Sequence, residues 1–226
     1  MSDKRPKTKD GTSRSSSALR PSSIVPLRPW EGGPVVVGRR IAVVGTSASG
    51  KTTLARRLAR TLHIPHIGLD ALHWEPNWTE APDEVFRERT LKALRGDAWS
   101  VDGNYSQVRD IVWSRADTVV WLDYPLQVIL WRLTLRTFRR VFRREVLWGG
   151  NRESIRTVFF SKNSLYVWVL TTYKRRRREY PELFAMPEHA HIRVVRLTSP
   201  RAADAWLARV KPPAPPHHSG EGGVRK

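Results

Sequence analysis

The chain contains no cysteine among its 226 residues, which excludes disulfide bonds and thiolate metal sites. No apolar run approaches the roughly 20 residues of a membrane-spanning helix, and the N-terminal stretch has no apolar block of the kind found in secretory signals. These absences favour a cytoplasmic protein without a membrane partner. The length suits one α/β domain with a sizeable core and additional tails.

Acidic residues are scarce: 21 stand against 40 basic residues, which gives a net charge of +19. Such an imbalance is typical of proteins that bind nucleic acid. It is also expected when an arginine-rich genome encodes a site for a polyanionic nucleotide, and we favour this second interpretation. Nucleic-acid binding through basic tails remains the alternative.

Two terminal stretches have little periodic apolar content. Residues 1–34 combine Ser, Pro, Lys and Arg, and residues 211–226 are rich in Pro and Gly. Such compositions cannot bury enough apolar surface to fold. We therefore predict a disordered basic tail, a single domain over residues 35–210, and a second disordered tail.

Short β-branched runs alternate with longer helical patterns between the tails. We expect helices over residues 52–62 and 82–96, and two more within residues 126–180 that are separated by a glycine-containing break near 148–151. Continuous apolar strands separated by helices indicate a parallel sheet that is covered on both faces. The prediction is a three-layer α/β fold whose five strands cover residues 40–45, 66–70, 99–104, 117–123 and 191–197.

The stretch "VVGTSASGKTT" joins the first strand to the first helix. Gly45 and Gly50 allow backbone amides to approach phosphate oxygens, and the helix N-terminus favours an anion. In such a loop Lys51 reaches the β- and γ-phosphates, and the Thr52 hydroxyl ligates Mg²⁺. The residues predicted to bind the nucleotide are Gly45, Thr46, Ser47, Ala48, Ser49, Gly50, Lys51, Thr52 and Thr53.

Three predicted strands end in aspartate, at Asp70, Asp102 and Asp123. Ligands of open parallel sheets bind at the carboxyl ends of the strands. A carboxylate there holds Mg²⁺ through water or orients an acceptor hydroxyl. The alternative is that each aspartate caps the turn that follows its strand.

Several motifs resemble the nucleoside monophosphate kinase and shikimate kinase group of P-loop proteins, over about residues 39–208. "VDGNY" is similar to the Asp-Gly-Phe-Pro-Arg element of adenylate kinases, and "LDYPLQVILWRLTLR" resembles their Asp-x-Pro strand end and the helix that leads to the lid. The resemblance implies a P-loop NTPase fold that uses ATP and Mg²⁺. It places Asp102 near the metal, and Arg132 and Arg136 where two arginines stack on adenine and clamp phosphate.

More closely, the chain resembles bacterial proteins described as adenylate kinase-like or as DNA topology modulation proteins, through "GLDALHWEPNW", "LWGGNRE" and "VVRLTSPRA". The segment "LWGGNRE" suggests a short arginine-rich lid, about residues 136–155, that closes over the nucleotide with Arg152. One departure concerns the acceptor: the two arginines that bind AMP phosphate in adenylate kinases are missing here. Arg109 is a substitute for one of them, and the departure argues against AMP as the acceptor.

The stretch "DALHWEPNW" lies where the acceptor lid of that group lies. Asp70 is placed to accept a proton from an acceptor hydroxyl, His73 to donate a hydrogen bond, and Trp74 and Trp78 to wall the pocket. The structural alternative is that the tryptophans pack the loop onto the sheet and that His73 is part of the core.

Arginines dominate the region after the fourth strand. Arg132 and Arg136 begin a stripe at spacing four, and guanidinium groups stabilise the charge of a transferring phosphoryl group. We interpret "KRRRREY", residues 174–180, as a solvated helix face. The alternative is a nucleic-acid groove in which Trp148 or Trp168 stacks on bases.

Together these features predict ATP- and Mg²⁺-dependent phosphoryl transfer to a small-molecule acceptor, with ATP hydrolysis as the fallback activity. The predicted catalytic residues are Lys51, Asp70, Arg136 and Arg152. The alternative functions are a nucleic-acid-associated P-loop NTPase and a nucleotide-dependent switch. A switch is disfavoured because no guanine-specificity motif of the form Asn-Lys-x-Asp is recognisable. The sequence does not fix the oligomeric state.

Overall fold

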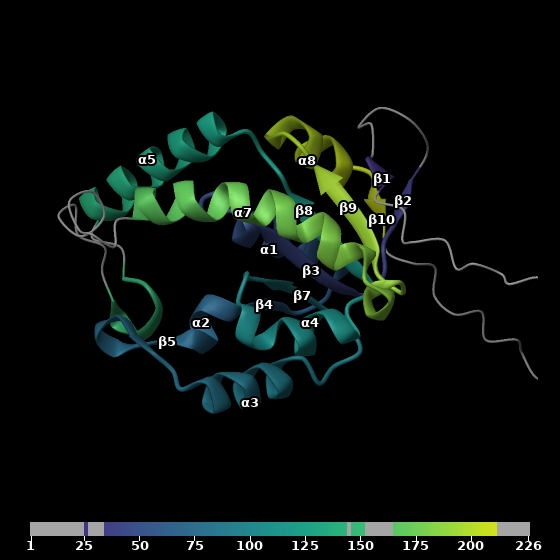
Figure 1. Cartoon of the computed structure of the whole chain (residues 1–226), viewed down its shortest axis with the longest axis horizontal. Coiled ribbons are helices and arrows are strands. Elements are labelled where there is room, and N and C mark those ends of the chain that lie inside the picture. The colour runs from purple at the N-terminus through teal and green to yellow at the C-terminus, as the bar shows by residue number, and fades with distance from the viewer. Residues whose placement is uncertain (1–24, 27–33, 144–145, 152–164, 212–226) are drawn as a thin grey trace, which may run out of the picture.

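A six-stranded, all-parallel sheet forms the centre of the molecule (Figure 1). The computed structural model describes residues 25–26, 34–143, 146–151 and 165–211. Among these, no helix has the length and apolar character needed to cross a membrane. In spatial order the strands of the sheet are β1 (Val25–Pro26), β9 (Arg193–Leu197), β8 (Thr118–Leu122), β3 (Arg40–Gly45), β7 (Trp99–Asp102) and β4 (His66–Gly68).

All five predicted strands are present, and the three-layer α/β prediction is confirmed. The first of the five predicted strands, β3, lies between β7 and β8 in the middle of the sheet. The two-residue β1 adds a sixth strand at one edge, inside the stretch that composition alone assigned to a tail. The rest of both predicted tails, apart from residues 34 and 211, lies outside the described residues.

The strands are buried on both faces, which explains their continuous apolar sequences. Because successive side chains of a strand point to opposite faces, β3 contributes to two separate cores. Ile41 and Val43 join the cluster beneath α1 (Lys51–Leu62), whereas Ala42 and Val44 join the cluster that contains Phe86 and Trp99.

The helices cover the sheet on both faces. With α1 they are α2 (Leu69–His73), α3 (Asp83–Ala93), α4 (Arg109–Arg115), α5 (Leu126–Phe142), α7 (Leu165–Ala185) and α8 (Pro200–Leu207). Shorter elements are β2 (Val35–Val36), β5 (Trp74–Glu75), β6 (Thr79–Glu80), β10 (Val210–Lys211) and the 3₁₀ turns η1 (Pro76–Trp78), η2 (Ser106–Val108), η3 (Trp148–Gly150) and η4 (Pro187–His189).

Helix α7 crosses from one face of the sheet to the other. Its first turns bury Val169 and Tyr173 in one core cluster, and its last turns bury Tyr180 and Phe184 in the other. Because Pro181 lies inside the helix, a break before it was expected, yet the helix continues to Ala185. Burial of the two rings on either side offsets the roughly 3 kcal/mol that an interior proline costs. The crossing brings the middle of α7 over the strand ends, where ligands of such sheets bind.

Candidate nucleotide-binding and acceptor site

The predicted phosphate loop joins β3 to α1, as its context requires. Gly45 has φ +149° and Gly50 has φ +96°, values that L side chains rarely adopt. A Cβ atom at Gly45 would lie 2.6 Å from the carbonyl oxygen of Leu122 on the neighbouring strand. The turn is closed by the backbone N–H of Ser49, which donates to the carbonyl of Thr46 over 3.1 Å. The loop therefore has the close backbone approach that phosphate cradles need.

Lys51 is a desolvated cation within this loop. Its Nζ donates to the Thr46 carbonyl over 3.2 Å. Burial, together with the neighbouring Arg176 guanidinium, lowers the pKa of Lys51 to about 8, although Asp70 and Asp102 oppose the shift. Two cations close together in a desolvated site are stabilised by an anion placed between them. A phosphate or carboxylate group of a substrate is such an anion.

A buried carboxylate lies beside the loop. The Thr52 hydroxyl donates to Oδ2 of Asp102 over 2.6 Å, and His66 Nε2 lies 2.7 Å from Oδ1 of the same residue. Asp102 is only 3% exposed. A hydroxyl and one carboxylate fit Mg²⁺, which takes few protein ligands and keeps its phosphate and water ligands. Among the described residues, no cluster of three or more His, Cys, Asp or Glu side chains forms a separate metal site.

His66 and Asn104 are residues of this site that the sequence analysis missed. His66 orients Asp102, and the Asn104 amide brackets Gly45: its Oδ1 accepts from the Gly45 N–H over 3.1 Å and its Nδ2 donates to the Gly45 carbonyl. Tyr180 of α7 also donates to Asn104 Oδ1, over 3.2 Å. These partners are 36 to 76 residues apart in sequence, so no local pattern signals them.

Helix α5 brings arginines to the loop. Arg132 Nη1 donates to the Ser49 carbonyl over 2.9 Å, and the guanidinium lies over the Tyr124 ring at 5.4 Å. Arg136 follows one turn later and lies close enough to Lys51 to lower its pKa. Both positions agree with the predicted donor site. Arg152, the remaining predicted lid arginine, lies outside the described residues.

Asp70 lies at the start of α2, beyond the end of β4. Tyr105 donates its hydroxyl proton to Asp70 Oδ1 over 2.6 Å. Burial, together with the Asp70 charge, raises the pKa of Tyr105, so the phenol stays protonated and acts as a donor. The Asp70 charge also lies near enough to Lys51 to raise the pKa of that lysine against the effect of burial.

The other predicted acceptor residues of this stretch are placed differently. His73 is 2% exposed and packs against the rings of Trp74, Phe86 and Tyr105, with centroids 4.4 to 4.9 Å apart. This placement favours the structural role for His73, because packed rings leave an acceptor little access to it. Trp78 is 38% exposed and meets Trp74 edge to face at 5.5 Å.

Asp123, the third strand-end aspartate, is engaged in ion pairs. Its carboxylate accepts from Arg196 Nε over 2.9 Å and lies 2.9 Å from Arg177 Nε. The Arg177 side chain is nevertheless 44% exposed and reaches this buried carboxylate from the surface. The interpretation of the run as a solvated helix face is wrong for Arg176, which is only 8% exposed. Asp123 is thus a structural anion that holds α7 and β9 to the sheet, and it is not open to a ligand.

Loss of one of these arginines should destabilise the fold. We expect Arg196→Met to lower the free energy of unfolding by about 1–3 kcal/mol, since a buried carboxylate loses two of its hydrogen bonds. Urea denaturation measures the change. The matched control is Arg175→Met, because Arg175 is exposed and pairs only with Glu179 on its own helix; a change within about 0.5 kcal/mol is expected there. Equal losses in both variants would contradict the structural role of Asp123.

A polar cavity opens between α7 and the chain that follows β7. Its volume is about 370 Å³, and its lining includes Asn104, Arg109, Arg176 and Tyr180, together with Glu179 and Glu182. Arg176 is 8% exposed, and its buried Nη1 has no hydrogen-bond partner among the residues that the structure describes. Burial lowers the pKa of Arg176. A buried guanidinium with an unused donor indicates an anion-binding position.

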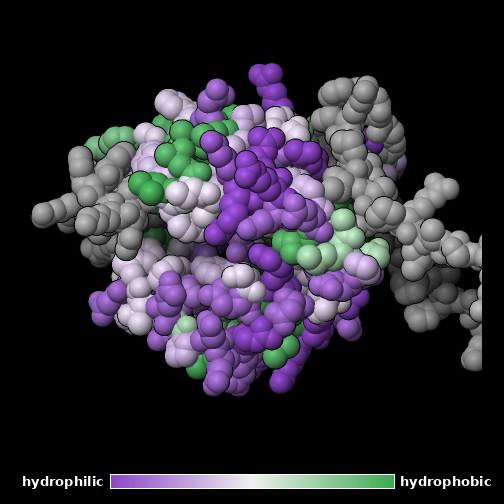
Figure 2. Space-filling model, viewed as in Figure 1, coloured by the Kyte–Doolittle hydropathy of each residue, from purple (hydrophilic) through white to green (hydrophobic). Residues whose placement is uncertain are grey.

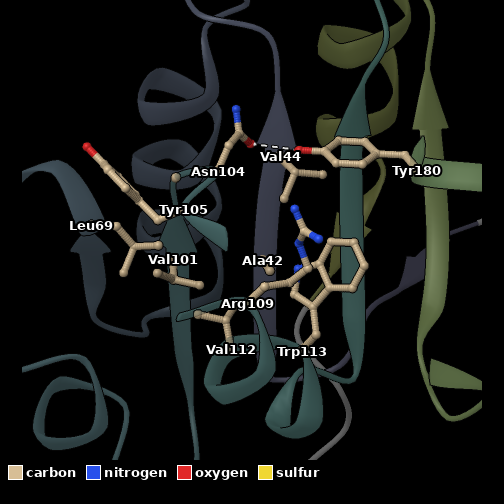
Figure 3. Close-up of a pocket in the computed structure, with 11 residues that line it drawn as sticks. Ala42, Val44, Leu69, Val101, Asn104, Tyr105, Arg109, Val112, Trp113 and Tyr180 are labelled. Atoms are coloured by element: carbon tan, nitrogen blue, oxygen red, sulfur yellow. Dashed lines mark hydrogen bonds between the residues drawn. The ribbon is translucent and has the colours of Figure 1, made fainter. Parts of the chain in front are cut away.

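A smaller apolar hollow adjoins this cavity (Figure 3). Arg109 enters it over the ring of Trp113, at 5.6 Å, with its guanidinium between Tyr105 and Tyr180. Asn104 and Tyr180 line both spaces. Arg109 also lines both, so its guanidinium is shared by the hollow and the cavity of Arg176. On the outer surface, hydrophilic residues gather over this part of α7 (Figure 2).

The strand order and the glycine loop define an α/β fold with a phosphate-binding loop at the end of its central strand. No family model matches the chain. A shikimate kinase of Bacteroides fragilis is 31% identical over 117 residues, and the match covers 45% of this chain but only 65% of the relative. This similarity confirms the predicted resemblance to the shikimate and adenylate kinase-like P-loop group.

Solved structures with a similar fold include three bacterial kinases. A sugar kinase of a Janibacter species is 19% identical and covers 76% of this chain and 94% of its own, with a TM-score of 0.43. A gluconokinase of Sinorhizobium meliloti has 21% identity, coverage of 77% and 94%, and a TM-score of 0.45. A shikimate kinase of Acinetobacter baumannii in complex with shikimate has 20% identity, coverage of 76% and 90%, and a TM-score of 0.45.

Proposed function

We propose that the protein is a kinase that transfers the γ-phosphoryl group of ATP, with Mg²⁺, to a hydroxyl of a small anionic acceptor. The observation that carries this proposal is the convergence of charges on Lys51. Asp70, Asp102, Arg136 and Arg176 all lie near enough to shift its pKa, although they come from four different elements. Phosphoryl transfer needs this combination of a phosphate cradle, a metal-associated carboxylate, a base and cationic clamps.

On the donor side, the loop amides and Lys51 hold the phosphates, and Arg132 holds the loop from α5. Thr52 and Asp102 would hold Mg²⁺, which supplies positive charge to the phosphate oxygens. His66 fixes the Asp102 carboxylate from the other side. Arg136, one turn beyond Arg132, is placed to stabilise the charge on the transferring group.

On the acceptor side, Asp70 accepts the hydroxyl proton while the acceptor oxygen bonds to the γ-phosphorus and the bond to ADP breaks. Tyr105 holds the carboxylate in place. Arg109 and Arg176 bind the negative group of the acceptor. The similarity to a shikimate kinase supports this chemistry, because shikimate is a carboxylate that carries hydroxyl groups.

The acceptor class is testable with a panel of radiolabelled-ATP reactions. We expect product with at least one hydroxy-carboxylate or hydroxy-phosphate, shikimate included, and none with neutral polyols of the same size. Arg176→Gln should raise the acceptor KM by about 10-fold or more, since a charged hydrogen bond is lost, and leave the KM for ATP unchanged. Arg178→Gln, on an exposed position of the same helix, is the control. Turnover of polyols alone, or an unchanged acceptor KM, would contradict the proposal.

The nucleic-acid alternative loses part of its support in the structure. Arg176 and Arg177, two of the four consecutive arginines in "KRRRREY", face the site and Asp123. Trp168, proposed above to stack on bases, instead lies under the Arg176 guanidinium at 4.8 Å. A cytoplasmic location and the two tails remain predictions.

A further inference from the structure

The loop that follows α5 docks onto the stretch of chain behind Asp70. We name residues 147–151 the latch and residues 74–80 the acceptor segment. The latch is a closed turn: the Leu147 N–H donates to the Asn151 carbonyl over 2.7 Å, and the Gly150 N–H donates to the Leu147 carbonyl over 3.1 Å. The acceptor segment is a small hairpin in which β5 pairs with β6 around η1.

The Asn151 side chain joins the two segments. It is 6% exposed, and its Oδ1 accepts from the Trp78 N–H over 2.9 Å. Its Nδ2 donates to the Glu75 carbonyl and to the Trp148 carbonyl, each over 2.8 Å. Both amide hydrogens are therefore used: one bonds within the latch, and the other bonds across to the acceptor segment. A buried, fully satisfied amide of this kind fixes a single relative position of the two segments.

The two adjacent glycines of the latch differ in the space that a side chain would have. Both have positive φ, +64° at Gly149 and +77° at Gly150. A Cβ atom at Gly149 would lie 2.6 Å from the carbonyl carbon of Glu75, whereas a Cβ atom at Gly150 would meet nothing within 4 Å. Gly149 therefore permits direct backbone contact with the acceptor segment, and Gly150 permits only the turn.

Helix α5 connects the latch to the nucleotide loop. Arg132 contacts the Ser49 carbonyl near the start of the helix, and Arg140, two turns later, lies over the Trp148 ring at 5.9 Å. Arg132, Arg136 and Arg140 form the predicted stripe at spacing four. Its first arginine thus contacts the phosphate loop, and its third contacts the latch. An unbroken series of contacts runs from the phosphate loop through α5 and the latch to the acceptor segment.

We propose that Asn151 is a positioning residue. Together with the Gly149 contact it holds the acceptor segment against the latch, and through the latch it connects this segment to α5. A nucleotide that orders the phosphate loop and α5 then also orders the chain next to Asp70. The two substrates are brought together through this one connection. The inference rests on the proposed function, because it assumes a nucleotide at the loop and an acceptor at Asp70. The sequence predicted that this region contacts the nucleotide. The latch is thus inferred to act on the acceptor side of the site as well.

Amide hydrogen exchange with MgAMP-PNP, a non-hydrolysable probe, tests the connection in the full chain. In the unaltered protein we expect the probe to slow exchange in residues 43–53 and, by about 10-fold, in residues 74–80. In Gly149→Ala, protection of 43–53 should remain and the probe-dependent protection of 74–80 should disappear. Gly150→Ala is the matched control: it carries the same backbone strain without the clash, and should behave as the unaltered protein.

Asn151→Asp gives a second, independent variant. It keeps the acceptor oxygen for Trp78 but turns two donated hydrogen bonds into contacts between oxygens, so the transmitted protection should again be lost. With the acceptor found in the panel, acceptor kcat/KM should fall about 10-fold while the KM for MgATP stays unchanged.

Three results would overturn the latch proposal: persistence of the transmitted protection in Gly149→Ala, equal loss in both glycine variants, or its absence from the unaltered protein despite protection of 43–53. Absence of any protection at 43–53 would instead contradict the proposed function itself, and the latch with it.

Discussion

Replacing Lys51 with alanine should lower the rate of phosphoryl transfer by about 10³-fold while leaving the fold intact. The rate falls because the loop loses the only lysine ammonium that faces the transferring phosphate within the described residues, and groups of this kind typically contribute 10²–10³-fold. The fold is retained because Lys51 contributes little to stability. Burial disfavours its charge, Arg176 repels it, and its hydrogen bond to the Thr46 carbonyl is 3.2 Å long.

Single-turnover transfer from labelled ATP measures the first effect, and the free energy of unfolding in urea measures the second. We expect the stability of Lys51→Ala to equal or exceed that of the unaltered chain, since a repelled cation is removed. Lys92→Ala is the matched control, because Lys92 is an exposed lysine of α3. Turnover in Lys51→Ala at the original rate would rule out the proposed mechanism, whatever its stability.

The donor half of the site was predictable from the sequence because its signals are local. Gly45, Gly50, Lys51 and Thr52 occur within eight consecutive residues, and backbone geometry alone makes that spacing meaningful. The five strands were equally accessible, because each is a continuous apolar run that a doubly covered parallel sheet requires. The prediction that Arg132 belongs to the nucleotide site followed from the family resemblance. Its contact with the Ser49 carbonyl gives a physical reason for its position.

The acceptor half was less accessible because it depends on where α7 crosses the sheet. From the sequence, Arg175, Arg176 and Arg177 are one basic run. In the structure Arg175 is exposed at the edge of the cavity, Arg176 is buried in its wall, and Arg177 pairs with Asp123. Successive positions of a helix face different directions, so the fate of each arginine depends on the packing of α7. No periodicity within the run distinguishes the three.

The roles of the three aspartates that follow strands were also not predictable from the local sequence. Asp102 ends β7, Asp123 directly follows β8, and Asp70 lies two residues beyond β4 in the first turn of α2, so all three are at the same edge of the sheet. Their neighbours nevertheless assign them different roles. Asp102 lies against Thr52 and His66, Asp70 against Tyr105, and Asp123 against two arginines. Only the first two are placed to act on a ligand. The position of the aspartates at one edge of the sheet was predictable from the direction of the strands. The side chains that contact them come from distant parts of the chain, so their roles were not.

The second large effect concerns Asp70. Asp70→Asn should lower kcat by about 10²–10⁴-fold, which is the usual contribution of a general base. The substitution preserves the size of the side chain, and the amide oxygen still accepts the hydrogen bond from Tyr105. We therefore expect the KM values for ATP and for the acceptor to change little, because the residue is lost as a base and kept as a positioned group.

Steady-state kinetics with the acceptor from the panel separate this role from a structural one. Asp97→Asn, at an exposed aspartate between α3 and β7, is the control and should leave kcat unchanged. Tyr105→Phe provides a graded comparison, since it leaves the base in place and removes only its hydrogen-bond donor; a smaller fall in kcat, about 10-fold, is expected. A raised acceptor KM with unchanged kcat in Asp70→Asn would assign Asp70 to binding. The proton of the acceptor hydroxyl would then pass directly to a phosphate oxygen, and the convergence of Asp70 and Arg176 on Lys51 would serve only to place the acceptor.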